Sequence, residues 1–181
     1  MLDIRSLRCL AGLLVALLLL AACSEKKVAD NSVVGAKDMR EPLLRANTFL
    51  VSADSLRIVA YNKESKWHLR PTESGLWFEI TKQGRGKLAG MGDAVKVKYS
   101  TKMLKGPVIY CSDSLGVLSF VLGKGTETRG MEEAIMLLAK GGKARFVQPP
   151  FLAYGLVGDG KMIPPRAIVV SEIELVDIVT K

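Results

Sequence analysis

Hydrophobic and polar residues alternate after Gly75, and this pattern predicts a β-sheet. In the segment GDAVKVKYSTK, Val95 and Val97 alternate with Lys96 and Lys98, which is the period of a strand with one solvated face. Five further short segments fit strands: residues 76–84, 108–111, 117–122, 144–148 and 168–178. The second half of the chain therefore reads as six strands.

A helical pattern interrupts these strands between the fourth and the fifth, in the segment MEEAIMLLAKGG. Its hydrophobic residues recur at i, i+3, i+4 and i+7: Met131, Ala134, Ile135 and Leu138. Glu132 and Glu133 favour the positive N-terminal end of this helix, and Gly141 offers a C-terminal stop. We predict an α+β domain, in which one helix covers the apolar face of a mostly antiparallel sheet.

A second helical pattern precedes the sheet, between Glu41 and Trp67, and predicts one or two helices. Pro42 is tolerated in a first helical turn. The apolar residues that recur there are Leu43, Leu44, Leu50, Val51, Leu56, Val59 and Ala60. We expect this apolar face to pack on the following domain, with a dimer contact as the alternative. The predicted organisation is a helical extension over residues 41–74 and a folded domain over residues 75–181.

The N-terminal residues have the features of a secretory signal. Arg5 and Arg8 precede a short apolar run from Leu10 to Leu20, which is too short for an ordinary membrane span. The residues Leu20-Ala21-Ala22-Cys23 resemble a bacterial lipobox, which implies a signal peptide over residues 1–22 and a lipid on Cys23. The alternative is an ordinary signal with an incidental cysteine. Residues 23–40 are polar and aperiodic, and we interpret them as a flexible tether.

Composition excludes several other classes of function. The 181 residues are 49% hydrophobic with a net charge of +8, but no dense basic run with interleaved aromatics indicates nucleic-acid binding. If Cys9 leaves with the signal and Cys23 carries lipid, Cys111 has no disulfide partner. His68 is the only histidine and metal-ligand spacings are absent, so we expect neither a metal nor another cofactor. Met131 stands where a phosphate-binding loop requires lysine.

Several spaced motifs carry a family resemblance. They are GDAVKVKYS, LSFVLGKG, TRGMEEAIMLLAKGGKARFVQPP, LAYGLVGDGKMIPP and RAIVVSEIELVDI. Together they resemble the FKBP-type peptidyl-prolyl isomerases over residues 75–179, which implies a twisted antiparallel half-barrel wrapped around the helix at Met131. With the lipobox, the helical extension and YCSDSLG, the chain is similar to a Bacteroidetes-type lipoprotein branch in which some members are associated with gliding motility.

The resemblance implies a set of site residues. Tyr99, Phe120, Tyr154 and Ile163 would line the pocket, and the Tyr154 hydroxyl would donate to a bound prolyl carbonyl. Several positions depart from the family pattern: Ile109-Tyr110 replaces a Phe-Asp pair, Met131 a tryptophan, Glu127-Thr128 an apolar pair, and Ser171 an aromatic residue. Leu118 and Met162 complete the expected substrate contacts. Ser171 falls on the inward register with Ile173, so we expect phenylalanine at position 171 to strengthen prolyl-ligand binding.

The implied activity is isomerisation of prolyl peptide bonds in exported or envelope polypeptides, without an acid–base pair. An apolar pocket that prefers the twisted amide lowers the rotation barrier by differential binding. The implied location is the cell envelope, with a lipid anchor in the outer membrane and the domain facing the periplasm. The alternatives are a non-catalytic module that binds or chaperones proteins, and a structural envelope lipoprotein. The oligomeric state does not follow from the sequence.

Overall fold

A computed structural model describes residues 40–179 of the chain. The predicted signal peptide, Cys23 and nearly all of the predicted tether lie outside these residues. Contacts divide the chain into residues 1–44 and 45–181, and the packing described below lies within the second unit. None of the helices in residues 40–179 is long and apolar enough to cross a membrane.

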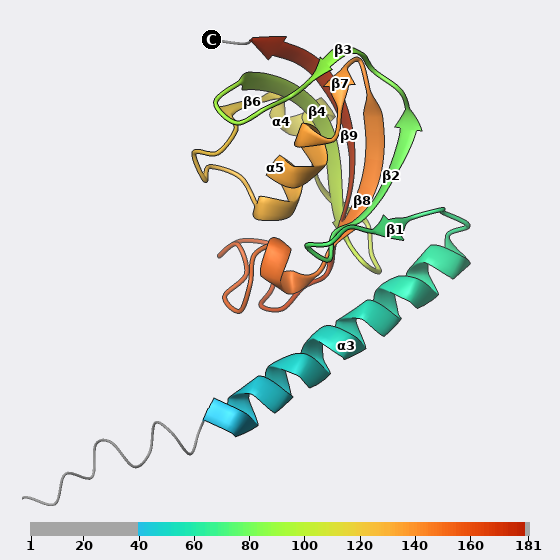
Figure 1. The fold of residues 1–181 in the computed structure, drawn as a ribbon, viewed down its shortest axis with the longest axis vertical. Helices are drawn as coiled ribbons and strands as arrows, with labels where there is room; N and C mark the ends of the chain where they lie inside the picture. The colour runs from blue at the N-terminus through green and yellow to red at the C-terminus, as the bar shows by residue number, and fades with distance from the viewer. Residues whose placement is uncertain (1–39, 180–181) are drawn as a thin grey trace, which may run out of the picture. The chain divides into compact units, whose positions relative to one another are not determined.

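The elements drawn in Figure 1 are α3 (Arg40–Glu64), β1 (Arg70–Pro71), β2 (Trp77–Lys82), β3 (Arg85–Leu88), β4 (Ala94–Met103), β5 (Val108–Cys111), α4 (Ser112–Leu115), β6 (Leu118–Val121), α5 (Arg129–Met136), β7 (Ala139–Lys140), β8 (Lys143–Gln148), η1 (Pro150–Leu152) and β9 (Val169–Val179).

The main sheet has seven antiparallel strands in the order β1-β2-β8-β9-β4-β5, with β6 also paired to β4. β9 pairs with β4 on one side and β8 on the other, which places it at the centre. The alternation predicted for β4 is confirmed, because Val95 and Val97 are buried while Lys96 and Lys98 are exposed. The six predicted strands are all present, and Figure 1 shows the sheet curving around α5. The predicted α+β fold is confirmed.

Three strands of the described region, β1, β3 and β7, were not predicted, and each has a physical reason. β1 and β7 contain two residues each, which is too short to show alternation. All four residues of β3 are exposed, so its sequence carries no buried face. β3 and β7 pair with each other in a separate two-stranded sheet.

The helix α5 lies inside the curve of the sheet and is capped by Thr128, whose side chain accepts a hydrogen bond from the Met131 amide. The apolar face predicted for it is buried. The prediction that Gly141 ends the helix is wrong, because α5 stops at Met136 and the next residues turn into β7 to pair with β3. Gly141 serves instead in the turn before β8, where its φ of 81° suits a residue without a Cβ.

Two hydrophobic clusters cover opposite faces of the sheet. The inner cluster packs around α5, and the outer cluster packs beneath α3. The inner cluster contains Leu76, Ala89, Val95, Val97, Phe120, Leu122, Met131, Ala134, Ile135, Leu138, Ala144, Phe146, Leu152, Ile173 and Leu175. The outer cluster contains Ile58, Leu69, Leu104, Val147, Ile168 and Val170, with Tyr61, Trp67 and Trp77 packed against it. Because neighbouring strand residues point to opposite faces, Phe146 belongs to the inner cluster and Val147 to the outer one.

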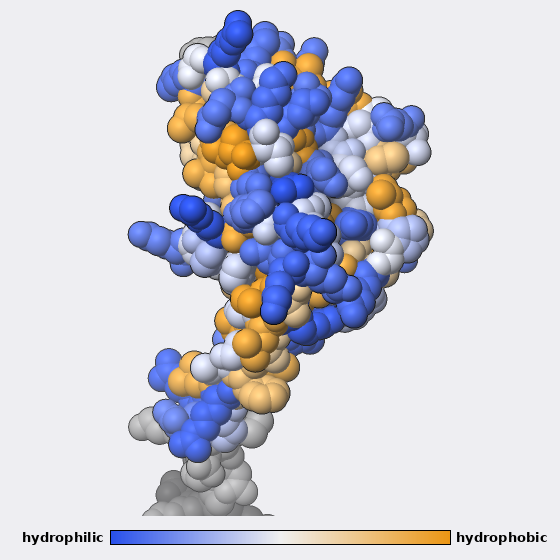
Figure 2. Space-filling model, turned by 90° about the vertical axis from the view of Figure 1, so that its right-hand side faces the viewer, coloured by the Kyte–Doolittle hydropathy of each residue, from blue (hydrophilic) through white to orange (hydrophobic). Residues whose placement is uncertain are grey.

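The helical extension is a single helix, and it packs on the domain differently from the prediction. Asp54 and Ile58 are its buried residues. Within residues 45–64, the residues predicted to form the packing face are largely exposed, including Val59 and Leu56, the last at 70%. Figure 2 shows hydrophobic side chains gathered along α3. The predicted packing of that stripe is therefore wrong for residues 45–64, because the side chains buried there are Asp54 and Ile58, which lie outside the predicted stripe.

Candidate active site

A cleft of about 440 Å³ lies where β5, the residues before α5 and the loop after η1 meet. Its lining residues are Tyr110, Thr126, Glu127, Thr128, Ala153, Tyr154, Asp159 and Lys161. Four of them were predicted from the sequence: Tyr110, Glu127, Thr128 and Tyr154. The structure thus brings together site residues that are up to 44 positions apart in the chain.

Tyr154 provides a free hydrogen-bond donor in this cleft. Burial, together with the nearby carboxylates of Glu127 and Asp159, raises the pKa of Tyr154 to about 12. Its hydroxyl therefore stays protonated at neutral pH. Within residues 40–179 this hydroxyl has no hydrogen-bond partner, so it is not used for local structure and is available to a ligand carbonyl.

Asp159 organises the loop that forms one rim of the cleft. Its Oδ1 accepts hydrogen bonds from the amides of Lys161 and Ile163, at 2.8 and 2.9 Å. Its Oδ2 accepts from the Tyr110 hydroxyl at 2.5 Å. Burial opposes the charged form of Asp159, but these hydrogen bonds outweigh it and lower the pKa of the carboxyl. The rim is therefore held to β5 and to its own backbone.

Gly158 lets this loop close. Its φ is +75°, and a Cβ at this position would lie 2.3 Å from the carbonyl oxygen of Ile163. A larger residue would therefore clash with the backbone that Asp159 holds. Asp159 was missed in the sequence, although an aspartate between two glycines is a signal for a side chain that bonds its own turn.

Thr128 and Gly130 fix the opposite wall. The Thr128 hydroxyl donates to Gln148 Oε1 at 2.7 Å and accepts from the Met131 amide at 3.3 Å. A Cβ on Gly130 would lie 2.6 Å from the same Gln148 oxygen, so a larger residue there would force the buried Gln148 side chain to shift. Thr128 therefore joins α5 to β8, and its hydroxyl is already engaged.

Glu127 is the other acidic residue of the cleft, and its situation differs from that of Asp159. It is half-buried, and within residues 40–179 it forms no hydrogen bond or ion pair. Burial, followed by the charge of Glu132, raises the pKa of Glu127 above its usual range. Glu132 also has a buried carboxylate oxygen without a partner in this part of the chain.

The predicted apolar wall residues lie in the core and are absent from the lining of the cleft. Phe120 and Met131 belong to the inner cluster, Tyr99 and Leu118 pack against it, and Ile163 is buried in the rim loop. Burial, followed by the charges of Glu127 and Cys111, raises the pKa of Tyr99. Contact of these residues with a prolyl ring stays a prediction.

Ser171 lies on the inward register, as expected, but its surroundings are closed. It is 0% exposed, and its hydroxyl is 3.2 Å from that of Thr101 on the neighbouring strand. It does not line the cleft. The two hydroxyls contact each other inside the domain, so a phenylalanine at this position would have to displace buried neighbours.

Ile109 and Met162 occupy the margins of the site. Ile109 is half-buried on β5, and Met162 is 60% exposed on the rim loop. Neither lines the cleft. Their predicted roles in binding stay predictions.

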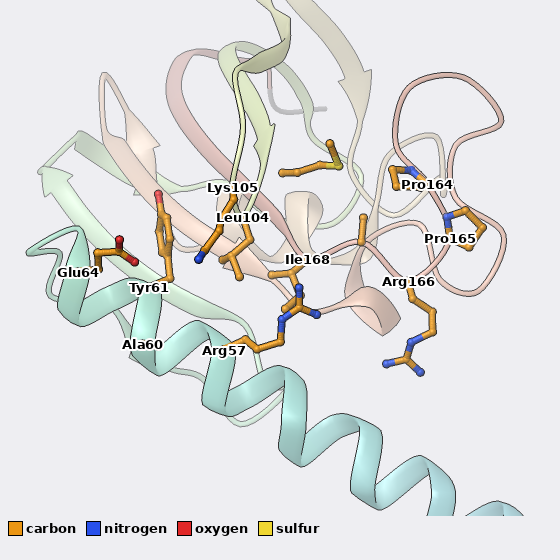
Figure 3. A pocket seen from close by; sticks show the side chains of 12 residues that line it. Arg57, Ala60, Tyr61, Glu64, Leu104, Lys105, Pro164, Pro165, Arg166 and Ile168 are labelled. Atoms are coloured by element: carbon orange, nitrogen blue, oxygen red, sulfur yellow. The ribbon is translucent and has the colours of Figure 1, made fainter.

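A second pocket of about 550 Å³ lies between α3 and the segments 103–105 and 164–168. Figure 3 shows Arg57 and Tyr61 rising from α3 toward Leu104 and Ile168. Arg166, which also lines this pocket, donates from its guanidinium to Asp54 Oδ2 at 2.9 Å. Arg166 has a left-handed backbone with φ of 58°, and its amide donates to the carbonyl oxygen of Gly155. The rim loop is thus closed at its end by a residue that is bonded to α3.

Comparison with known proteins places these features in a family. The profile of the family described as "FKBP-type peptidyl-prolyl cis-trans isomerase" matches residues 86–176. The FKBP-type 22 kDa peptidyl-prolyl cis-trans isomerase of Escherichia coli is 34% identical over 128 residues, which cover 71% of this chain and 61% of that protein. FK506-binding protein 2 of Candida glabrata is 37% identical over 110 residues, which cover 58% of this chain and 81% of that protein.

A solved structure agrees with the sequence comparisons. The crystal structure of AtFKBP13 matches with a TM-score of 0.57 and 30% sequence identity, over 61% of this chain and 98% of that one. Several curated relatives are longer proteins. For example, the matched region spans 45% of the probable FKBP-type peptidyl-prolyl cis-trans isomerase of Haemophilus influenzae, which is 35% identical over 111 residues. The chain thus spans about half the length of such relatives.

Proposed function

Because the chain belongs to the FKBP-type peptidyl-prolyl cis-trans isomerase family, we propose that it accelerates rotation about the peptide bond before proline in polypeptide clients. The observation that carries this proposal is the hydroxyl of the half-buried Tyr154 in the cleft. It is protonated and forms no hydrogen bond within residues 40–179. Such a donor can hold a peptide carbonyl in the cleft.

The chemistry requires no nucleophile. Amide resonance gives the bond a rotation barrier of roughly 18–20 kcal/mol, and an uncatalysed X-Pro bond takes on the order of tens to hundreds of seconds to isomerise. A cleft that removes water from the carbonyl and binds the twisted amide better than the planar one lowers this barrier. Tyr154 supplies the hydrogen bond that orients the peptide, and the rim held by Asp159 supplies a fixed wall.

The test is isomerisation of an Ala-Pro peptide by the full-length chain. We expect wild type to accelerate the reaction and Tyr154→Phe to lower kcat/KM about 2- to 10-fold, since one neutral hydrogen bond is worth about 0.5–1.5 kcal/mol. Tyr61→Phe is the matched control, because Tyr61 lies on α3 outside the cleft. No acceleration by wild type would refute catalysis.

A protein-binding module without catalysis is the second candidate. The observation that favours it is the polar wall formed by Glu127 and Thr128, where the family pattern has apolar residues. Binding of prolyl peptides without any acceleration would identify this function. Loss of both binding and acceleration would leave a structural role.

We also propose that the protein is anchored to the cell envelope by lipid, on the periplasmic side of the outer membrane, and belongs to the Bacteroidetes-type lipoprotein branch. The support is the lipobox-like Leu20-Ala21-Ala22-Cys23 after the apolar run. Cys23→Ser should leave an unprocessed precursor, whereas Cys9→Ser should change nothing because that residue leaves with the signal. Equal mature mass and membrane association of wild type and Cys23→Ser would contradict the anchor.

A further inference from the structure

We infer that Glu127 makes the cleft selective for prolines flanked by lysine or arginine. This inference rests on the proposed prolyl-peptide function and names the class of substrate for the same site. Glu127 belongs to the Glu127-Thr128 pair that stands where the family pattern has two apolar residues. The argument starts from the two carboxylates that line the cleft, Glu127 and Asp159.

The two carboxylates have different tasks. Asp159 accepts three hydrogen bonds, from Tyr110, Lys161 and Ile163, so both of its oxygens are engaged in holding the rim. Glu127 has no hydrogen-bond or ion-pair partner within residues 40–179, although it is half-buried. A half-buried carboxylate without a partner carries a desolvation cost that a cation from outside would offset. Glu127 is therefore the group that can form an ion pair with a positively charged ligand.

Nothing in the described part of the chain supplies that cation. Lys161 lines the same cleft but forms no ion pair with Glu127 or Asp159 among residues 40–179. Glu132 lies near enough to Glu127 to raise its pKa, which adds negative charge on the same side. The electrostatic environment of the cleft wall is therefore acidic, although the whole chain has a net charge of +8.

The size and chemistry of the cleft suit a peptide with a basic side chain. A volume of about 440 Å³ lies within the usual range of ligand pockets. A ligand carbonyl can accept from Tyr154, while a neighbouring ammonium or guanidinium can donate to Glu127 in a charge-assisted hydrogen bond. A glutamate at the same ligand position would meet a like charge, so the selectivity has an attractive and a repulsive part.

The experiment uses the full-length chain and peptides that differ at one position. One set carries lysine, alanine or glutamate directly before proline, and a second set carries them directly after it. In at least one set we expect kcat/KM to be about tenfold higher for lysine than for glutamate. In Glu127→Gln this ratio should fall to about 2 or less, and in Glu127→Lys it should invert. Glu172→Gln, in which an exposed acid of β9 outside the cleft is changed, should keep the wild-type ratio.

The outcomes separate this inference from the proposed function. Acceleration of the alanine peptides with lysine-to-glutamate ratios below about 2 in both sets would overturn the selectivity and leave the isomerase proposal standing. A ratio that Glu127→Gln does not change would also overturn it. If wild type accelerates no peptide, the isomerase proposal fails. The selectivity is then tested by measuring peptide affinities. Equal Kd values for the lysine and glutamate peptides would overturn the proposed selectivity.

Discussion

The inner and outer clusters cover opposite faces of one sheet, but they are built differently. The inner cluster draws on β4, β6, β8, β9 and α5, and on residues in the connections between the elements. The outer cluster has six members, and α3 contributes only Ile58 to its buried set. The comparison teaches that the domain depends on a distributed core, whereas the attachment of the helical extension depends on a few side chains.

The largest expected effect comes from a cavity in the inner cluster. Phe146 is fully buried on β8, so Phe146→Ala should lower the free energy of unfolding by about 3–5 kcal/mol, as such truncations generally do. Chemical denaturation measured by tryptophan fluorescence checks this value. A loss below about 1 kcal/mol would mean that the inner cluster is not the main core.

A smaller effect is expected where α3 meets the outer cluster. Ile58→Ala should cost about 2 kcal/mol, the low end for such substitutions, because the side chains above it at Tyr61 and Trp67 are partly exposed and can relax. Leu56→Ala is the matched control on the exposed face of the same helix and should stay within about 0.5 kcal/mol. Equal losses in the two variants, measured by thermal unfolding, would show that the exposed stripe is also buried in solution.

The third prediction sharpens the contrast between the core and the cleft. Because Ser171 is enclosed in the domain and bonded to Thr101, Ser171→Phe should overpack the sheet and cost about 1–3 kcal/mol of stability. Ser171→Ala should cost less, since it removes one hydroxyl without adding volume. Tighter prolyl-peptide binding by Ser171→Phe at unchanged stability would instead place residue 171 in the cleft.

The smallest effect concerns an ion pair on the outer face. Arg145 Nε donates to Glu79 Oε2 at 2.8 Å, and its guanidinium lies 4.5 Å from the Trp67 ring centre. The hydrogen bond from Arg145 holds the pKa of Glu79 below its usual value. A lowered folded-state pKa means that the stabilisation is present above the unfolded-state pKa and is lost as the pH falls through the folded-state value.

Glu79→Gln should therefore cost at most about 1 kcal/mol at pH 7, and the difference from wild type should shrink as the pH falls below about 4, since the carboxyl of the unfolded chain titrates near that value. Denaturation curves at pH 7 and pH 3 measure the change. A difference that grows on acidification would contradict the assigned charge state.

Much of the domain could be predicted from local pattern. β4 shows a clean alternation because one face meets the inner cluster and the other meets water, and α5 shows helical spacing because it is buried on one side. The end of α5 could not be predicted, because it is decided by the pairing of β7 with β3 rather than by Gly141. The prediction of how α3 packs was also wrong, because a hydrophobic stripe on a helix does not by itself show which surface covers it.

The candidate site was predicted in part. Tyr110, Glu127, Thr128 and Tyr154 carry motif positions and do line the cleft. Asp159 and Lys161 were missed, because their roles arise from hydrogen bonds within the loop and from its fold back onto β5. Ser171 was assigned to the pocket from the family resemblance and from its strand register. Register gives the face of the sheet, but it does not tell whether a residue lies under the cleft or inside the closed core.

The bond between Arg166 and Asp54 gives the rim loop a mechanical link to the helix α3. Arg166 keeps a left-handed backbone at the point where the loop closes on Gly155, and its side chain is held by a buried carboxylate on that helix. The end of the rim loop and the helix that leads into the domain therefore share one residue, Arg166.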